Sequence, residues 1–213
     1  LVDHVARVRD RQAIALELWD ADAVHTLATH QREVARQAGA LVQLRLALNF
    51  LGGSLVQSGD LATAELVFDE DRLVAEATGN QPVLYNGVLL AVWRGQEAKA
   101  TELLESTRRE ADARGMGRFV TNLTYLESVL GNALGRYEDA RDAAWQAFER
   151  DELGFGSLIV PELAEAASRT GETALLNTAL DWVTERAQVT PTEWARGIEA
   201  RVGALASAGG AAE

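Results

Sequence analysis

Histidine and cysteine, two of the side chains that most often bind transition metals, are scarce in this chain of 213 residues. There is no cysteine, and the histidines are His4, His25 and His30. Because His25 and His30 are five positions apart, one helix would point them to different sides, whereas paired ligands on a helix share a face. The missing cysteines also exclude disulfides and thiolate ligands. We therefore expect no metal site.

Carboxylates that could act as general acid and base occur in two runs, 69–71 (Asp-Glu-Asp) and 149–152 (Glu-Arg-Asp-Glu). Consecutive helix positions spread around the axis, so such runs are typical of a solvated face rather than of a catalytic pair. A serine nucleophile would need a positioned base, and the chain has no Gly-x-Ser-x-Gly elbow. We expect this chain not to be an enzyme.

Close glycines at 52–53 and at 115 and 117 could approach a phosphate group. Neither place carries the Gly-x-x-x-x-Gly-Lys-Ser/Thr motif, and neither fits the strand–Gly-x-Gly-x-x-Gly–helix unit that binds dinucleotides. We expect no nucleotide or other cofactor in this chain.

The elements that hold these side chains are indicated by a glycine that recurs at intervals of 36, 40 and 36 residues. A period in this range is typical of stacked helical hairpins. Small or apolar residues follow each glycine at the fifth position, where two helices of a hairpin approach closely. The glycines are Gly59, Gly95, Gly135 and Gly171, and the following residues are Ala64, Ala100, Ala140 and Leu176.

Apolar residues three and four positions apart predict about eleven amphipathic helices. We expect an all-α fold, a right-handed superhelix of antiparallel helix hairpins with degenerate tetratricopeptide-like repeats, in one domain over 1–213. The five tryptophans are interpreted as wedges between helices. The helices are expected near 3–19, 22–37, 44–55, 61–77, 83–94, 97–114, 119–134, 137–153, 158–170, 173–187 and 191–207.

A binding groove is predicted from the repeat register, since the first helix of each hairpin lines the concave face of such an array. Amide side chains and tyrosines in the groove would suit a peptide strand or a small amphipathic ligand. The alternative is that these residues only face solvent. The predicted binding residues are Asn49, Tyr85, Asn122, Tyr125, Asn132 and Glu165.

Charge restricts the partners of the chain. Thirty-two acidic residues against 20 basic ones give a net charge of −12, which opposes binding to a phosphate backbone. No run of about 18 apolar residues and no signal peptide is found, so we expect a cytoplasmic location. Because the chain begins at Leu1 without methionine, we interpret it as a fragment of a larger protein.

Several short segments resemble the central helical region of LuxR-type transcriptional regulators of actinobacteria. Those proteins carry an AAA-type ATPase module before this region and a helix-turn-helix after it. The segments span nearly the whole chain: 18–23 (Leu-Trp-Asp-Ala-Asp-Ala), 38–41 (Ala-Gly-Ala-Leu), 46–49 (Leu-Ala-Leu-Asn), 91–95 (Ala-Val-Trp-Arg-Gly), 134–137 (Leu-Gly-Arg-Tyr), 161–167 (Pro-Glu-Leu-Ala-Glu-Ala-Ala) with Arg169, and 194–201 (Trp-Ala-Arg-Gly-Ile-Glu-Ala-Arg).

The resemblance implies a regulatory region that relays signals between the ATPase and the DNA-binding module by binding an inducer or a partner protein. ATP and DNA would be bound by the parent's other modules, so no catalytic or base-reading residue transfers to this chain. Expected partners are other domains of the parent, another protein, a peptide or a small inducer, and a homodimer can form through an end helix. The alternative is a free-standing tetratricopeptide-type scaffold unrelated to transcription.

Overall fold

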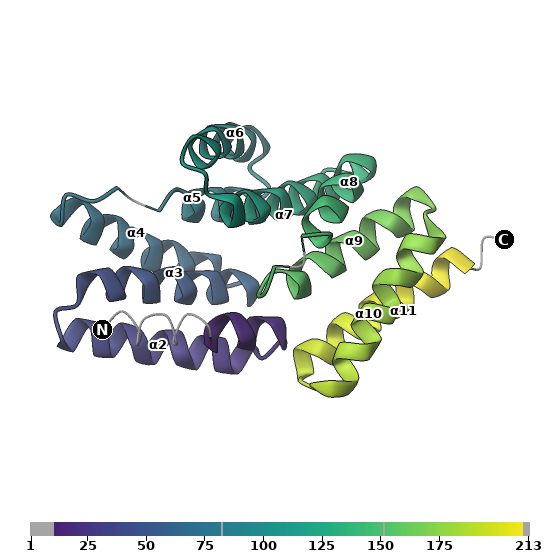
Figure 1. Cartoon of the computed structure of the whole chain (residues 1–213), viewed down its shortest axis with the longest axis horizontal. Coiled ribbons are helices and arrows are strands. Elements are labelled where there is room, and N and C mark those ends of the chain that lie inside the picture. The colour runs from purple at the N-terminus through teal and green to yellow at the C-terminus, as the bar shows by residue number, and fades with distance from the viewer. Residues whose placement is uncertain (1–10, 82, 151, 211–213) are drawn as a thin grey trace. The chain divides into compact units, whose positions relative to one another are not determined.

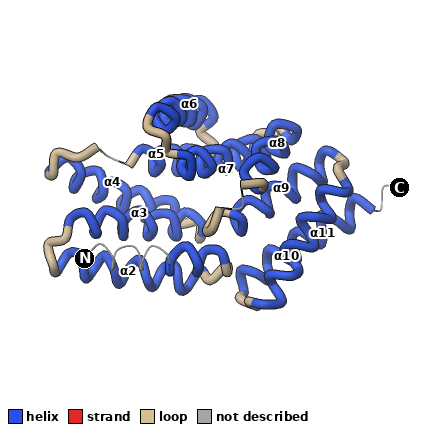
Figure 2. The backbone as a smooth tube through the Cα atoms, in the orientation of Figure 1, coloured by secondary structure: helices blue, strands red, loops and turns tan. Residues whose placement is uncertain are grey.

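The computed structural model describes residues 11–81, 83–150 and 152–210, and these residues form helices joined by short loops (Figures 1 and 2). No strand occurs among them. After helical residues 11–17, the helices are α2 (Ala21–Gln37), α3 (Leu41–Gln57), α4 (Leu61–Ala77), α5 (Leu84–Trp93), α6 (Glu97–Ala113), α7 (Gly117–Ala133), α8 (Tyr137–Phe148), α9 (Gly156–Thr170), α10 (Thr173–Val189) and α11 (Glu193–Gly210).

Consecutive helices pack against each other, as in the pairs α2–α3, α3–α4, α7–α8, α8–α9 and α10–α11. Helices two apart in the chain also touch, since α7 contacts α9 and α9 contacts α11. These contacts confirm the predicted all-α fold of stacked helical hairpins. No described helix has the length and apolar character needed to cross a membrane.

The helices group into two compact units. Unit 1 holds the described residues up to Ala15 together with Ala21–Leu103. Unit 2 holds Leu16–Asp20 together with the described residues from Leu104 onward. The single domain over 1–213 stays a prediction.

Glycine turns end most of the helices. At Gly59 the backbone has φ 83°, and its N–H donates to the Val56 carbonyl while the Asp60 N–H donates to the Leu55 carbonyl at 2.9 Å. This pair of bonds satisfies carbonyls at a helix end and requires a left-handed residue, which favours glycine. The same pair recurs, both within and between hairpins, at Gly39, Gly79, Gly95, Gly115 and Gly135.

Small residues let the helices of a hairpin come close, as the sequence predicted. Ala64, Ala100 and Ala140 are completely buried. On the facing helix, a Cβ added to Gly131 would lie 2.9 Å from the Ala140 Cβ, and one added to Gly52 would overlap the Phe68 ring. These glycines therefore set the distance between α7 and α8 and between α3 and α4.

The neighbouring glycines of α3 provide a matched test of this packing. We expect Gly52→Ala to lower the free energy of unfolding by about 2 kcal/mol, because the added methyl overpacks the core against Phe68. A Cβ added to Gly53 would have no heavy atom within 4 Å apart from its chain neighbours and the backbone of its own helix. Gly53→Ala should therefore raise stability by about 0.5–1 kcal/mol through helix propensity. Urea denaturation measures both, and equal effects would contradict the packing argument.

Several predicted helix ends differ from the structure by two or more residues, and two of them have a clear local reason. The helix predicted to reach residue 153 ends at Phe148, and the Leu153 carbonyl instead accepts a hydrogen bond from Arg118 Nη2 at 2.6 Å. The last helix begins at Glu193 rather than at Pro191. Thr192 precedes it and accepts the Ala195 N–H at 3.0 Å, so the N-cap is this threonine.

The core of unit 2 contains Trp19, which is 1% exposed and packs with residues of α9, α10 and α11. The Trp19 and Trp182 rings meet edge to face with centroids 5.8 Å apart. Phe148, Trp182 and Trp194 lie partly buried against the same core. The interpretation of tryptophans as wedges between helices holds for this group, whereas Trp145 is 37% exposed.

Candidate functional site

The predicted groove residues of unit 1 lie on neighbouring helices. Asn49 of α3 is half-buried, and its Nδ2 donates to the Arg45 carbonyl one turn earlier at 2.7 Å. Tyr85 of α5 is also half-buried, and removal of its phenol from water raises the pKa of that group well above its ordinary value. Asn49 is thus engaged within its own helix.

In unit 2 the first two predicted residues of α7 differ in environment. Asn122 is half-buried, and its Oδ1 is enclosed without a hydrogen-bond donor. Tyr125 is only 2% exposed, so its ring belongs to the core rather than to an open face. Truncating Tyr125 would therefore disturb packing and would be a poor probe of ligand binding.

The other two predicted residues, Asn132 and Glu165, belong to one connected set of polar side chains across α7, α9 and α11. Asn132 Nδ2 donates at 2.9 Å to both the backbone carbonyl and the Oε2 of Glu162. Arg201 places Nη1 3.8 Å from Glu162 Oε1 and Nη2 3.4 Å from Glu165 Oε2. We call Asn132, Glu162, Glu165 and Arg201 the polar row.

The polar row is partly accessible. The side chains of Glu162, Glu165 and Arg201 are 14%, 18% and 44% exposed. Arg169 also donates from Nε to Glu165 Oε1 at 3.0 Å, and this hydrogen bond raises the pKa of the Arg169 guanidinium above its ordinary value. The polar row can therefore form charge-assisted hydrogen bonds with a ligand. Such bonds are stronger than hydrogen bonds between neutral groups.

One atom of the polar row lacks a partner: Asn132 Oδ1 is buried without a hydrogen-bond donor. A buried unpaired acceptor costs roughly 1–3 kcal/mol, and a ligand N–H could relieve that cost. Glu162 and Arg201 were not among the predicted binding residues. The three-residue spacing of Glu162 and Glu165 on α9 was the signal that could have identified the first of them.

A tryptophan-containing turn forms a second feature of unit 2. Trp19 follows helical residues 11–17, and it alone among the described residues other than glycine has a positive φ, of 51°. Its Nε1 donates to the Ser157 carbonyl in α9 at 2.8 Å. Within α9 that carbonyl would normally accept from residue 161, but Pro161 has no N–H. The indole therefore supplies the donor that the proline lacks.

Three further hydrogen bonds attach the turn to unit 2. Ser157 Oγ donates to the Leu16 carbonyl at 2.9 Å, and the Gly154 N–H donates to Glu17 Oε2 at the same distance. Thr192 Oγ1 donates to the Trp19 carbonyl at 2.8 Å. The segment 16–20 is thus fixed by its backbone as well as by its side chains.

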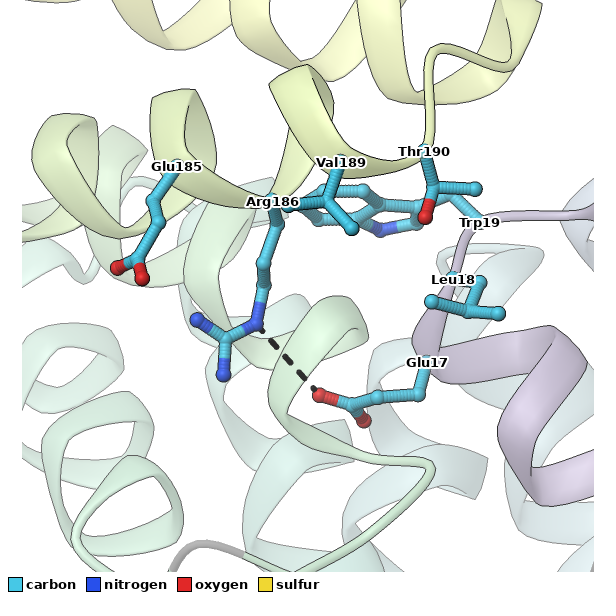
Figure 3. A pocket seen from close by; sticks show the side chains of 7 residues that line it. All are labelled: Glu17, Leu18, Trp19, Glu185, Arg186, Val189 and Thr190. Carbon is cyan, nitrogen blue, oxygen red and sulfur yellow. Dashed lines mark ion pairs between the residues drawn. The ribbon is translucent and has the colours of Figure 1, made fainter.

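A hollow of about 250 Å³ lies between this turn and the end of α10 (Figure 3). Glu17 and Arg186 point toward one another, with Oε1 and Nε 3.9 Å apart. The Arg186 guanidinium carbon lies 3.4 Å from the centre of the Trp182 ring, a cation–π contact. The lining residues, which we call the Trp19 hollow, are Glu17, Leu18, Trp19, Glu185, Arg186, Val189 and Thr190.

The acidic run 69–71 in unit 1 only partly follows the sequence interpretation. Asp69 pairs with Arg72 on the surface. Asp71, however, is 1% exposed and accepts a hydrogen bond from Arg45 Nε at 2.8 Å, so the expectation of a solvated face was wrong for this residue. The reason is tertiary, since Asn86 of α5 also donates to Asp71, at 3.5 Å.

Residues suited to metal binding do not gather in the described parts of the chain. No group of three or more His, Asp or Glu side chains is placed there to hold an ion. His25 Nδ1 lies 3.4 Å from Ser54 Oγ. His4, Asp151 and the predicted helical residues 3–10 lie outside the described residues.

Comparisons with protein-family models, with curated proteins and with solved structures find no match for this chain. The class of this protein is therefore assigned from its fold alone. The glycine turns, the buried small residues and the neighbour-to-neighbour contacts make it an all-α helical-repeat protein.

Proposed function

We propose that this chain is the regulatory binding region of a LuxR-type transcriptional regulator, acting between an ATPase module and a DNA-binding module. The polar row is the observation that carries the binding role. It lies on α7 and α9, the first helices of their hairpins, and on the last described helix, α11, and it includes two residues of the predicted groove. The sequence segments that resemble this family support the regulatory role.

Binding at the polar row would couple to the array through the helices that the row joins. A ligand that contacts α7, α9 and α11 together favours the arrangement of these helices that fits it best. The coupling between two sites in such systems is typically about 1–3 kcal/mol. A change of this size would alter how either end of the array holds a neighbouring module.

The encoding gene gives a direct test of the proposed parent. We expect a Walker-type nucleotide motif upstream and a basic helix-turn-helix downstream. A reading frame with neither would favour the free-standing tetratricopeptide-type scaffold, and would contradict the transcriptional role without bearing on the polar row.

The binding role itself is tested by a thermal-shift screen with ATP, a panel of small metabolites and a peptide library, followed by calorimetry on each hit. We expect Arg201→Ala to weaken the binding of a true ligand by at least tenfold, because one charge-assisted hydrogen bond contributes about 1.5–3 kcal/mol. Arg109→Ala on α6 is the control, since Arg109 is 72% exposed and likewise pairs with a glutamate, Glu105. Equal weakening by both variants, or no hit at all, would overturn the role of the polar row.

A further inference from the structure

We propose that the Trp19 hollow is a second binding site, which takes one apolar side chain of a basic peptide segment from a partner protein. The hollow is lined by residues 17–19 and by residues at the end of α10 and directly after it, all in unit 2. It shares no residue with the polar row. The site therefore goes beyond the proposed function and can be tested independently of it.

The volume of the hollow favours a single side chain over a whole small molecule as the ligand. Its volume is about 250 Å³, whereas pockets that enclose a drug-sized ligand span about 300–1,000 Å³. A hollow of this size holds one large side chain. A peptide that inserts such an anchor and lays its backbone over the rim matches the hollow better than a whole metabolite does.

The apolar lining is unusually exposed. Val189 is 77% exposed, the largest value among the exposed large hydrophobic residues of the described chain, and Leu18 across the hollow is 39% exposed. Covering apolar surface contributes about 25 cal/mol per Å². An inserted Leu, Met or Phe side chain would remove both residues from water at one point, as interface anchors do.

The charges around the hollow favour a cationic partner. The charged residues that line the hollow are Glu17, Glu185 and Arg186, so the lining has a net charge of −1. The Arg186 charge is already shared between Glu17 and the face of Trp182, while Glu185 is exposed on α10. Glu185 lies beyond Arg186 as seen from Leu18 (Figure 3), so a Lys or Arg one or two positions from the apolar anchor would reach it, and this complementarity would also raise the association rate.

The hollow is also held in shape before any partner arrives. Trp19 is fixed through Nε1 to the Ser157 carbonyl and through its own carbonyl to Thr192. Glu17 is fixed by the Gly154 N–H. Because these residues are already ordered, a peptide would not have to order them on binding, which favours affinity.

The test is selection of a phage-displayed random twelve-residue peptide library against the full chain, followed by fluorescence anisotropy with enriched peptides. We expect the enriched peptides to carry a large apolar residue within two positions of Lys or Arg. Their affinity should fall at least tenfold for Glu185→Lys and for the double variant Leu18→Ser/Val189→Ser. Arg201→Ala should leave it unchanged, which separates this site from the polar row.

Glu138→Lys is the matched control for charge, because Glu138 is exposed on α8 and does not line the hollow. It should change peptide affinity by less than twofold. Thermal melting checks that each variant is folded, and Glu185→Lys keeps the test decisive if the double serine variant is not. Acidic consensus peptides, equal binding to wild type and Glu185→Lys, or no enrichment would each overturn the proposal.

Discussion

Replacing Trp19 by alanine is expected to lower the free energy of unfolding by about 3–5 kcal/mol, the usual range for a buried aromatic residue. The side chain is 1% exposed, packs edge to face on Trp182 and belongs to the core formed with α9, α10 and α11. Urea denaturation followed by circular dichroism measures the loss. Trp145→Ala is the control, since that ring is 37% exposed and should matter much less.

Trp19→Phe removes the hydrogen bond and part of the ring, and a double-mutant cycle with Pro161→Ala separates these two effects. We expect Trp19→Phe to cost about 1–3 kcal/mol, because the Ser157 carbonyl is left without a donor when residue 161 is proline. In a Pro161→Ala background the alanine N–H can serve that carbonyl, so Trp19→Phe should cost less there. The double-mutant cycle measures this coupling. The same cost in both backgrounds would show that the indole N–H does not compensate for the proline.

Asp71→Ala is the second change with a large expected effect, a loss of about 3–5 kcal/mol. Asp71 is 1% exposed and accepts from Arg45 of α3, whose side chain is 16% exposed, so removing the carboxylate leaves a largely buried positive charge. Arg45 Nη2 would keep only its hydrogen bond to the Gln81 carbonyl, at 2.9 Å. The measurement is again equilibrium urea denaturation.

Two further variants check this reason. Asp69→Ala should change stability by less than about 1 kcal/mol, because Asp69 is 54% exposed and its pair with Arg72 is screened by water. The double variant Asp71→Ala/Arg45→Met should recover part of the loss, since no unpaired charge remains. A double variant less stable than Asp71→Ala alone would argue against the buried charge as the cause.

Local chemistry explains which parts of the fold could be predicted from sequence. The helix predicted over 61–77 is found as α4 (Leu61–Ala77), because Asp60 caps its start and a glycine turn follows its end. The side chain of Asp60 accepts the Thr63 N–H, and hydrogen bonding with the side chain and the backbone of Thr63 lowers the pKa of Asp60. Signals of this kind lie within a few residues of the helix end and need no knowledge of the fold.

Contacts between distant residues explain the misses. Nothing near Asp71 in the sequence indicates that Arg45 and Asn86 would enclose it. Trp19 and Ser157 are 138 positions apart, so the sequence around Pro161 does not indicate that the Trp19 indole would replace the missing N–H. The groove register placed Asn132 and Glu165 on helices that touch, but it missed Glu162 between them because it selects single positions rather than faces.

Unit 2 is built from two separate stretches of the chain, and this limits where the protein can be divided, either in the laboratory or in evolution. A fragment beginning at Leu104 would lack residues 16–20 and with them the partners of the Ser157 carbonyl, the Gly154 N–H and the Thr192 hydroxyl. Gene fusion or recombination near residue 104 would therefore separate the helices of unit 2 from residues 16–20, which complete its core. Recombination between related genes should therefore keep residues 16–20 and the residues from 104 onward in the same gene, so we expect the two units to be inherited together.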